Sequence, residues 1–170
     1  MSAEEIFPIV NSNGEVIGKA TRKECHGGSM LLHPVVHLHV MRRGGWLYLQ
    51  QRAMTKDIQP GKWDTAVGGH VDYGETVEEA LRREAREELG ISGFTPVRLA
   101  PYMFRSSREC ELINPFYVYV GDDVNIVPDP GEITAGRFWH KNEIIENLDN
   151  NVFTPNFEAE FESLIKAYLK

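Results

Sequence analysis

Residues 69–91 read GHVDYGETVEEALRREAREELGI, and the interpretation of the whole chain starts from this stretch. Within it, apolar or small residues recur every three or four positions, at Val77, Ala80, Leu81, Ala85 and Leu89. This spacing places them on the buried stripe of an amphipathic helix. Thr76 followed by Glu79 is a capping-box pattern, and Gly90 is a typical C-terminal stop. The sequence therefore predicts a helix over residues 76–89.

Three glutamates of this predicted helix, Glu84, Glu87 and Glu88, are spaced i, i+3 and i+4. Their carboxylates share one face, with Cβ atoms about 5–6 Å apart, and therefore repel one another. A hard divalent cation, Mg²⁺ or Mn²⁺, fits such a face because it accepts carboxylates and keeps water ligands for a phosphate-bearing substrate. The alternative is a solvated acidic face paired with neighbouring arginines, which is the usual role of Glu/Arg-rich helices.

The spacing of the fixed positions resembles the Nudix box of MutT-like hydrolases: Gly69, Glu75, Arg83-Glu84, Glu87-Glu88 and Gly90. In Nudix hydrolases these glutamates hold metals that bridge a diphosphate, and a carboxylate activates the attacking water. The resemblance implies that Glu84, Glu87 and Glu88 are catalytic and bind the metal, with the Gly69 backbone beside it. It also implies a structural ion pair between Glu75 and Arg83.

Composition narrows the class of protein. The chain has 170 residues, a formal net charge of −7 and no run of lysines or arginines, which argues against a nucleic-acid-binding surface. The acidic start MSAEEIF lacks the apolar core of a signal peptide, and histidines and a proline interrupt the most apolar run. Two cysteines without a recognisable spacing suggest a reducing compartment. We expect a cytoplasmic protein that binds neither nucleic acid nor membrane.

The order of predicted elements indicates one domain over residues 1–170. It comprises an N-terminal hairpin and lead-in (1–33), a core (34–148) and a C-terminal helix (149–170). Strands are expected at 6–10, 15–17, 35–42, 46–52, 64–67, 94–104, 112–120 and 133–139, and helical segments at 21–25, 142–147 and 156–169. Strands interleaved with helices predict an α/β class with a mixed sheet. The resemblance sharpens this to the Nudix α/β/α sandwich.

A second resemblance is to the isopentenyl-diphosphate isomerases, one branch of the same superfamily. There, three histidines and two glutamates bind a metal, and the matching positions here are His26, His33, His70, Glu109 and Glu111. Imidazole ligands favour Mn²⁺, Zn²⁺ or Fe²⁺ over Mg²⁺, so the resemblance implies a second metal site of different character. The alternative is a cluster without an ion, whose histidines hydrogen-bond in a polar cleft.

The same resemblance implies that Arg52 and Lys56 contact a substrate diphosphate. One feature departs from the isomerases: their catalytic cysteine stands two residues before the metal-binding histidine, where this chain has Gly68, which has no side chain for proton transfer. Bacterial isomerases of this branch also lack the first two box glutamates, whereas Glu84 and Glu87 are present here. Both departures favour hydrolysis.

We therefore expect a metal-dependent hydrolase that cleaves a nucleoside diphosphate derivative or another organic diphosphate by water attack on phosphorus. The alternatives are an isomerase-like enzyme and a non-catalytic Nudix domain that senses a metabolite. Glu132 stands where several Nudix enzymes recruit a further ligand or base. Trp63 is a candidate for stacking a nucleobase, with local packing as the alternative. Homodimers are common in the superfamily, so the resemblance allows a homodimer.

Overall fold

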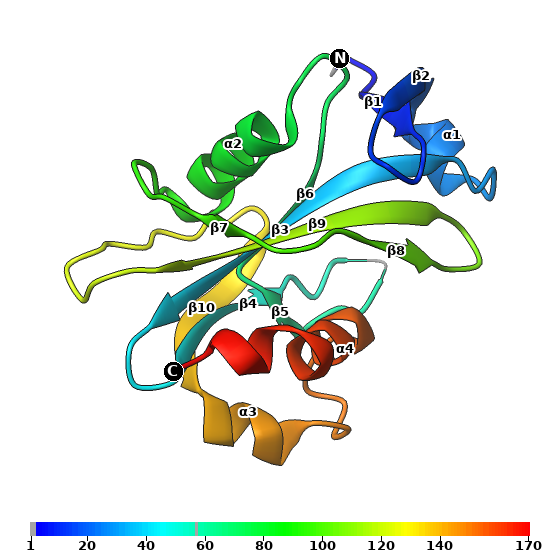
Figure 1. Cartoon of the computed structure of the whole chain (residues 1–170). Coiled ribbons are helices and arrows are strands. Elements are labelled where there is room, and N and C mark those ends of the chain that lie inside the picture. The colour runs from blue at the N-terminus through cyan, green and yellow to red at the C-terminus, as the bar shows by residue number, and fades with distance from the viewer. Residues whose placement is uncertain (1–2, 57) are drawn as a thin grey trace. The chain divides into compact units, whose positions relative to one another are not determined.

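The computed structural model describes residues 3–56 and 58–170 (Figure 1). Met1, Ser2 and Asp57, which belong to the N-terminal stretch and to the predicted loop after residue 52, lie outside the described residues. The chain forms two compact units. The first contains Met1–His37, Gly68–Glu84 and Arg98–Phe116, and the second contains Leu38–Val67, Ala85–Val97 and Tyr117–Lys170.

Five elements contribute to both units, including the strand β3 (Leu32–Arg42), the helix α2 (Val77–Leu89) and the strand β9 (Cys110–Tyr119). Within the described residues, the main sheet has the order β10-β4-β3-β9-β7, with β5 paired to β4, β6 to β3 and β8 to β9. The remaining strands of this sheet are β4 (Trp46–Arg52), β5 (Trp63–Thr65), β6 (Val67–His70), β7 (Val97–Arg98), β8 (Tyr102–Arg105) and β10 (Ile133–His140). Strands therefore alternate with helices along the chain, as an α/β class requires.

The first unit begins with a hairpin of β1 (Ile6–Val10) and β2 (Val16–Thr21), followed by the short helix α1 (Arg22–His26). A capping box starts α1: the Thr21 hydroxyl accepts from the Glu24 amide at 3.1 Å, and the Glu24 carboxylate accepts from the Thr21 amide at 2.8 Å. Phe7 and Cys25 are fully buried together under this hairpin. The predicted hairpin and helical turn are both confirmed.

The helix α2 begins and ends where the sequence predicts. The Thr76 hydroxyl accepts from the Glu79 amide at 3.1 Å, and Gly90 leaves the helix with a φ of +65°. The predicted stripe is fully buried at Ala80, Leu81, Ala85 and Leu89. The segment before the helix differs from prediction: the single strand expected at 64–67 is two strands, β5 and β6, and His70 lies on the second.

The second unit contains β4, which pairs antiparallel with β10 and with the end of β3. It also contains the helices α3 (Lys141–Asn147) and α4 (Pro155–Ser163). The single helix predicted over 156–169 is interrupted at Leu164, whose φ of −136° is not helical, and continues as the 3-10 helix η1 (Ile165–Tyr168). The Ser163 hydroxyl donates to the Ala159 carbonyl at 2.7 Å, a contact that commonly bends helices. The break lets Ile165 and Leu169 both become buried.

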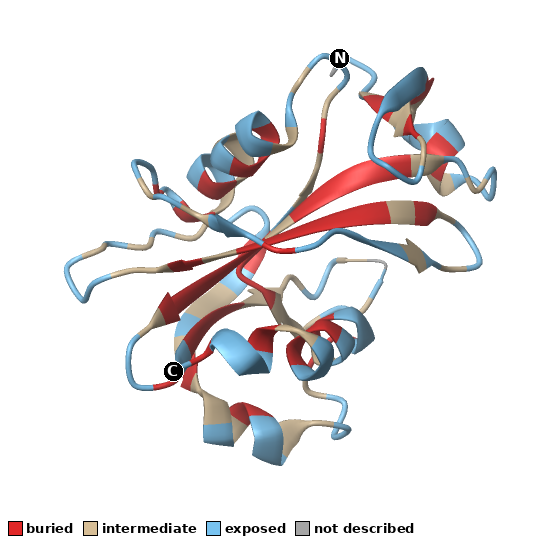
Figure 2. Ribbon diagram, in the orientation of Figure 1, coloured by how far each residue is buried: buried red, intermediate tan, exposed pale blue. Residues whose placement is uncertain are grey.

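One further prediction about strands was inaccurate. The strand expected at 94–104 is two short strands, β7 and β8, with Pro101 between them. On β3, His39 is fully buried, and Figure 2 shows β3 and β9 buried along most of their length. None of the helices among the described residues is long and apolar enough to cross a membrane.

Candidate active site and metal centre

Arg83 on α2 organises the loop that precedes the helix. Its Nε and Nη2 atoms donate to the two Glu75 carboxylate oxygens at 2.8 and 3.0 Å, so the predicted ion pair is present and two-pronged. Nη1 donates to Glu84 Oε1 at 2.8 Å, and Nη2 also donates to the His70 carbonyl at 3.0 Å. The planar guanidinium suits such a fixed fork of contacts. One side chain thus connects the loop, the strand β6 and the first box glutamate.

Electrostatics stabilise this ion pair. Burial alone would raise the pKa of Glu75, but hydrogen bonds from Arg83 and from the Asp72 backbone outweigh burial and hold that pKa below its ordinary value. The hydrogen bond to Glu75 in turn raises the pKa of Arg83 above its ordinary value. Both groups therefore stay charged at neutral pH.

Gly69 lies against the Glu84 carboxyl group. A Cβ atom at residue 69 would come within 2.2 Å of Glu84 Cδ, which no pair of real side chains tolerates. A side chain at this position would displace the Glu84 carboxylate, because the backbone and the carboxylate approach so closely. At the preceding residue, Gly68, a Cβ would meet only the His37 ring, at an ordinary contact distance of 3.7 Å.

The three box glutamates all lie on α2, as predicted. Because this helix is continuous, helical spacing alone puts Glu84, Glu87 and Glu88 on one face. The end of the helix is tied to the loop before β10: the Asp129 amide donates to the Glu88 carbonyl and the Val127 amide to the Leu89 carbonyl, each at 2.9 Å. The carboxylate set predicted for Mg²⁺ or Mn²⁺ is therefore carried by a well-anchored helix.

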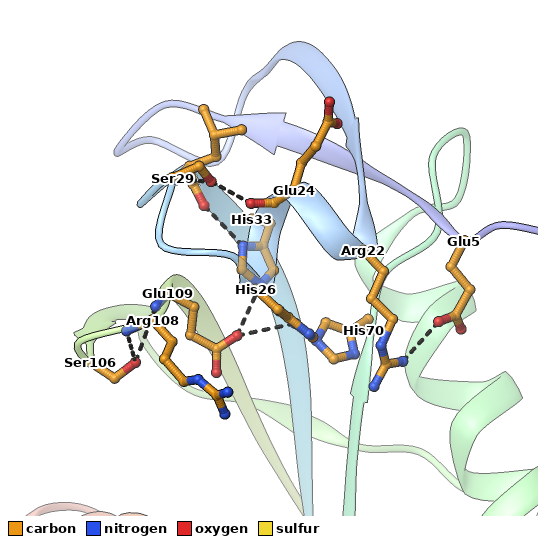
Figure 3. A network of polar contacts seen from close by, with 11 residues as sticks. Glu5, Arg22, Glu24, His26, Ser29, His33, His70, Ser106, Arg108 and Glu109 are labelled. Atoms are coloured by element: carbon orange, nitrogen blue, oxygen red, sulfur yellow. Dashed lines mark hydrogen bonds and ion pairs between the residues drawn. The ribbon is translucent and has the colours of Figure 1, made fainter.

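A second group of metal-type ligands meets in the first unit. Two triads share His33: one is completed by His26 from α1 and His70 from β6, the other by Glu109, just before β9, and Glu111 on β9. We call these five residues the His/Glu cluster. Figure 3 shows the three imidazoles and Glu109 pointing toward one another from separate segments. His26 Nε2 lies 3.2 Å from His70 Nε2 and 3.1 Å from Glu109 Oε2, and His33 Nε2 lies 3.8 Å from the same oxygen.

The chemistry of these atoms fits a metal. His33 is fully buried, its Nδ1 lies 2.9 Å from the Leu31 carbonyl, and its Nε2 has no hydrogen-bond partner among the described residues. A proton on Nδ1 leaves Nε2 with its lone pair aimed into the cluster, which is the arrangement of a metal-binding histidine. A buried polar atom without a partner is costly, and an ion would satisfy it.

The protonation states point the same way. Burial, reinforced by neighbouring positive groups, lowers the pKa of His70 to about 3, so this imidazole is neutral at physiological pH and able to coordinate. Burial also lowers the pKa of His26, although Glu109 opposes the shift. Burial and the nearby Glu109 raise the pKa of Glu111 to about 7, which is the expected response of two close carboxylates without a compensating cation.

Phe7 forms an aromatic wall of the cluster, a role that the sequence did not reveal. Its ring stacks on His70 with centroids 4.5 Å apart and an interplanar angle of 4°, and on His33 at 5.7 Å and 16°. The only signal in the sequence was an aromatic residue at an inward position of the first strand. A second missed feature is the buried His39, whose Nε2 lies 3.4 Å from the Glu160 carboxylate on α4.

Four other predicted site residues lie in the second unit. Lys56 Nζ and Glu132 Oε2 form an ion pair at 2.6 Å, so the structure brings these two candidates together. Arg52 donates from Nε to the Ile58 carbonyl at 3.1 Å, and its Nη1 lies 3.6 Å from Asp64. Trp63 packs edge-on against Trp139, with centroids 5.2 Å apart, which supports local packing rather than base stacking.

Comparisons with known proteins agree with this picture. An isopentenyl-diphosphate Delta-isomerase of Brevibacterium linens is 29% identical over 149 residues, covering 85% of this chain and 82% of the relative. An uncharacterized Nudix hydrolase of Streptomyces coelicolor is 39% identical over 92 residues, covering 54% of this chain and 50% of the relative. This chain therefore spans only about half the length of that hydrolase.

Solved structures share the fold. The protein DR0079 from Deinococcus radiodurans superposes with a TM-score of 0.77 at 24% identity, covering 98% of this chain and all (100%) of that one. A MutT protein from Methanosarcina mazei superposes with a TM-score of 0.66 at 23% sequence identity, and the match covers 82% of this chain and 96% of that one. The predicted α/β Nudix fold with a mixed sheet is thereby confirmed. The family model described as the NUDIX domain matches residues 31–161, which is most of the chain, and the protein belongs to this family.

Proposed function

We propose that this protein is a Mg²⁺- or Mn²⁺-dependent Nudix hydrolase that cleaves the diphosphate bond of an organic diphosphate by water attack on phosphorus. The observation that carries the proposal is the assembled box: Arg83 holds Glu75 and Glu84 together, and the Gly69 backbone lies against the Glu84 carboxylate.

Hydrolysis of a diphosphate requires a bound cation, contacts to the diphosphate and an activated water, and each of these roles can be assigned to residues of this chain. Glu84, Glu87 and Glu88 would hold the cation, which when bound neutralises charge on the non-bridging phosphate oxygens. Arg52 and Lys56 would bind the diphosphate, and Glu132, paired with Lys56 at 2.6 Å, would serve as a further base or ligand once substrate takes its place on that lysine. A carboxylate of the box would orient the water and receive its proton.

The test is turnover of a substrate panel with either metal. Nucleoside diphosphate derivatives, dinucleotides and isoprenoid diphosphates are incubated with wild type, a Glu87→Gln/Glu88→Gln variant and a Glu78→Gln control, which removes an exposed carboxylate from the first turn of the same helix. We expect the double variant to lose turnover while the control keeps it. Equal turnover by wild type and the double variant on every compound would refute the proposal.

We also propose that the His/Glu cluster binds one Mn²⁺, Zn²⁺ or Fe²⁺ ion. The converging Nε2 atoms of His26, His33 and His70 and the unsatisfied His33 nitrogen support it. Elemental analysis of protein purified without chelator or a nickel column should find this metal in wild type and not in a His26→Ala/His33→Ala variant. Equal metal content in the two, or none in either after addition of Mn²⁺ and Zn²⁺, would show that the site does not exist.

The cluster and the isomerase relatives favour a second candidate, an isomerase acting on a prenyl diphosphate. Its weakness is Gly68, which provides no proton donor. The contact at 3.7 Å shows that residue 68 has room for a side chain, so a Gly68→Cys variant is a fair test. Isopentenyl diphosphate in D₂O should acquire no deuterium with wild type. If NMR shows that wild type incorporates deuterium into isopentenyl diphosphate, the isomerase is favoured instead.

A further inference from the structure

The strand β6 joins the two candidate metal sites through consecutive residues. Gly69 lies against Glu84 of the Nudix box, so closely that a Cβ atom there would come within 2.2 Å of Glu84 Cδ. The next residue, His70, points its Nε2 into the His/Glu cluster, 3.2 Å from His26 Nε2. Successive residues of a strand face opposite sides, so one peptide unit separates the two sites. A shift of this peptide must therefore change the geometry of both the Nudix box and the His/Glu cluster.

Arg83 adds a second connection. The same guanidinium donates to the His70 carbonyl at 3.0 Å and to Glu84 Oε1 at 2.8 Å, and its two contacts with Glu75 keep it from rotating away. Its N–H groups form a rigid planar fork. The position of the His70 carbonyl therefore bears on the position of the Glu84 carboxylate through one shared guanidinium.

The His70 ring has little freedom to absorb a metal by moving alone. It stacks on Phe7 at 4.5 Å and 4°, and the backbone just beyond it is held by the Tyr73 amide, which donates to the Ile6 carbonyl at 2.8 Å. An ion bound at Nε2 would thus fix the whole residue, including its carbonyl. Glu109 and Glu111 would balance the two positive charges of that ion, so repulsion between the cations of the two sites is weak.

We propose that a metal in the His/Glu cluster increases the affinity of the Nudix box for Mg²⁺, through His70 and Arg83. This inference rests on the proposed function, and it makes the cluster a regulatory site for the box. The physical reason is preorganisation: an ion at His70 fixes the carbonyl that positions Arg83, so Glu84 is already placed when Mg²⁺ arrives. Linkage requires the effect to be reciprocal, with Mg²⁺ increasing the affinity of the cluster by the same factor.

The experiment measures both directions on protein stripped of metals with a chelator. Mg²⁺ is titrated by calorimetry with and without one equivalent of Co²⁺, and Co²⁺ is titrated by its visible absorption with and without saturating Mg²⁺. We expect each dissociation constant to fall about fivefold or more, and by equal factors because the same pair of metals is used in both directions. Unchanged constants, or failure of Co²⁺ to bind the cluster, would each overturn the inference.

Two variants assign the effect to Arg83. Arg83→Lys keeps the charge but loses the fork, and its coupling factor should fall toward one while both metals still bind. Arg86→Lys, an exposed arginine on the same helix, should keep the wild-type factor. Full coupling in Arg83→Lys would overturn the assigned route, and the wild-type titrations decide the matter if that variant does not fold. Substrate turnover is assayed separately: turnover without coupling rejects only this inference and leaves the proposed hydrolase intact.

Discussion

The Nudix box takes its residues from one continuous stretch, whereas the His/Glu cluster takes its five from α1, β3, β6 and β9. In the box, Arg83 already compensates Glu75 and Glu84 at 2.8 Å each. In the cluster, two carboxylates lie together and the buried His33 Nε2 has no hydrogen-bond partner within residues 3–56 and 58–170. Arg83 therefore compensates two carboxylates of the box without an ion, whereas a cation would compensate the two carboxylates of the cluster.

Among the single substitutions, the largest effect should come from Gly69→Ala, which tests how tightly the box is packed. The new Cβ would lie 2.2 Å from Glu84 Cδ, so the carboxylate must move. We expect turnover to fall about 100-fold, as misplacement by an ångström can cause, and stability to fall by about 1–3 kcal/mol. Gly68→Ala is the matched control, because its Cβ meets only an ordinary contact at 3.7 Å and should cost far less. Similar kinetics and melting temperatures for the two variants would contradict the packing described.

A comparable effect on stability should follow from adding metal to the cluster. At a free Zn²⁺ concentration one hundred times its dissociation constant, the ligand-binding contribution is about 2.7 kcal/mol, which raises the melting temperature by several degrees. His26→Ala/His33→Ala should lose this gain and His140→Ala, outside the cluster, should keep it. Thermal unfolding of the chelator-treated proteins provides the measurement, and an equal rise in all three would show that Zn²⁺ acts elsewhere.

The pH dependence of stability should distinguish the cluster from the box. The folded pKa of Glu111, about 7, exceeds its ordinary value of 4.5, so the folded state holds a proton that the unfolded state loses. Without metal, Glu111 should therefore cost stability as pH rises from about 4.5 to 7, by roughly 2 kcal/mol. The wild type minus Glu111→Gln difference in unfolding free energy isolates this contribution from the opposite trend of His70. A difference that stays level over this range, measured by urea unfolding, would refute the assignment.

The smallest effect concerns the aromatic wall of the cluster. Phe7→Leu keeps an apolar side chain but removes the stacking on His70 and His33, which is worth about 1 kcal/mol. The affinity for Zn²⁺ should fall severalfold. Phe161→Leu, an equally buried residue of the second unit, should lower stability without changing that affinity. The Zn²⁺ affinities of the two variants are compared by calorimetric titration. Equal affinities would show that Phe7 does not contribute to Zn²⁺ binding.

Much of the box could be predicted because its interactions are local. Helical geometry alone places Glu84, Glu87 and Glu88 on one face. The ion pair between Glu75 and Arg83 was predicted from the family resemblance and is present. The apolar stripe and the Thr76 cap also follow from neighbouring residues. What the spacing could not reveal is the third contact of Arg83, with the His70 carbonyl, because that contact depends on how β6 passes the helix.

The cluster could be proposed only through a family resemblance, since residues 26 and 111 have no local relation. Periodicity also failed where tertiary contacts decide the outcome. The alternation along β3 does not reveal that His39 is buried beside Glu160, and the helix predicted over 156–169 breaks at Leu164, after which Ile165 is buried. In each case a long-range contact outweighs the local pattern.

The most direct test of the proposed hydrolysis is to convert the panel compound that turns over fastest in ¹⁸O-labelled water with Mg²⁺. We predict one ¹⁸O atom in a phosphate product by mass spectrometry, with turnover reduced about 1,000-fold or more in Glu87→Gln/Glu88→Gln. Label found only in the non-phosphate product, or turnover by the double variant at the wild-type rate, would contradict water attack on phosphorus at the Nudix box.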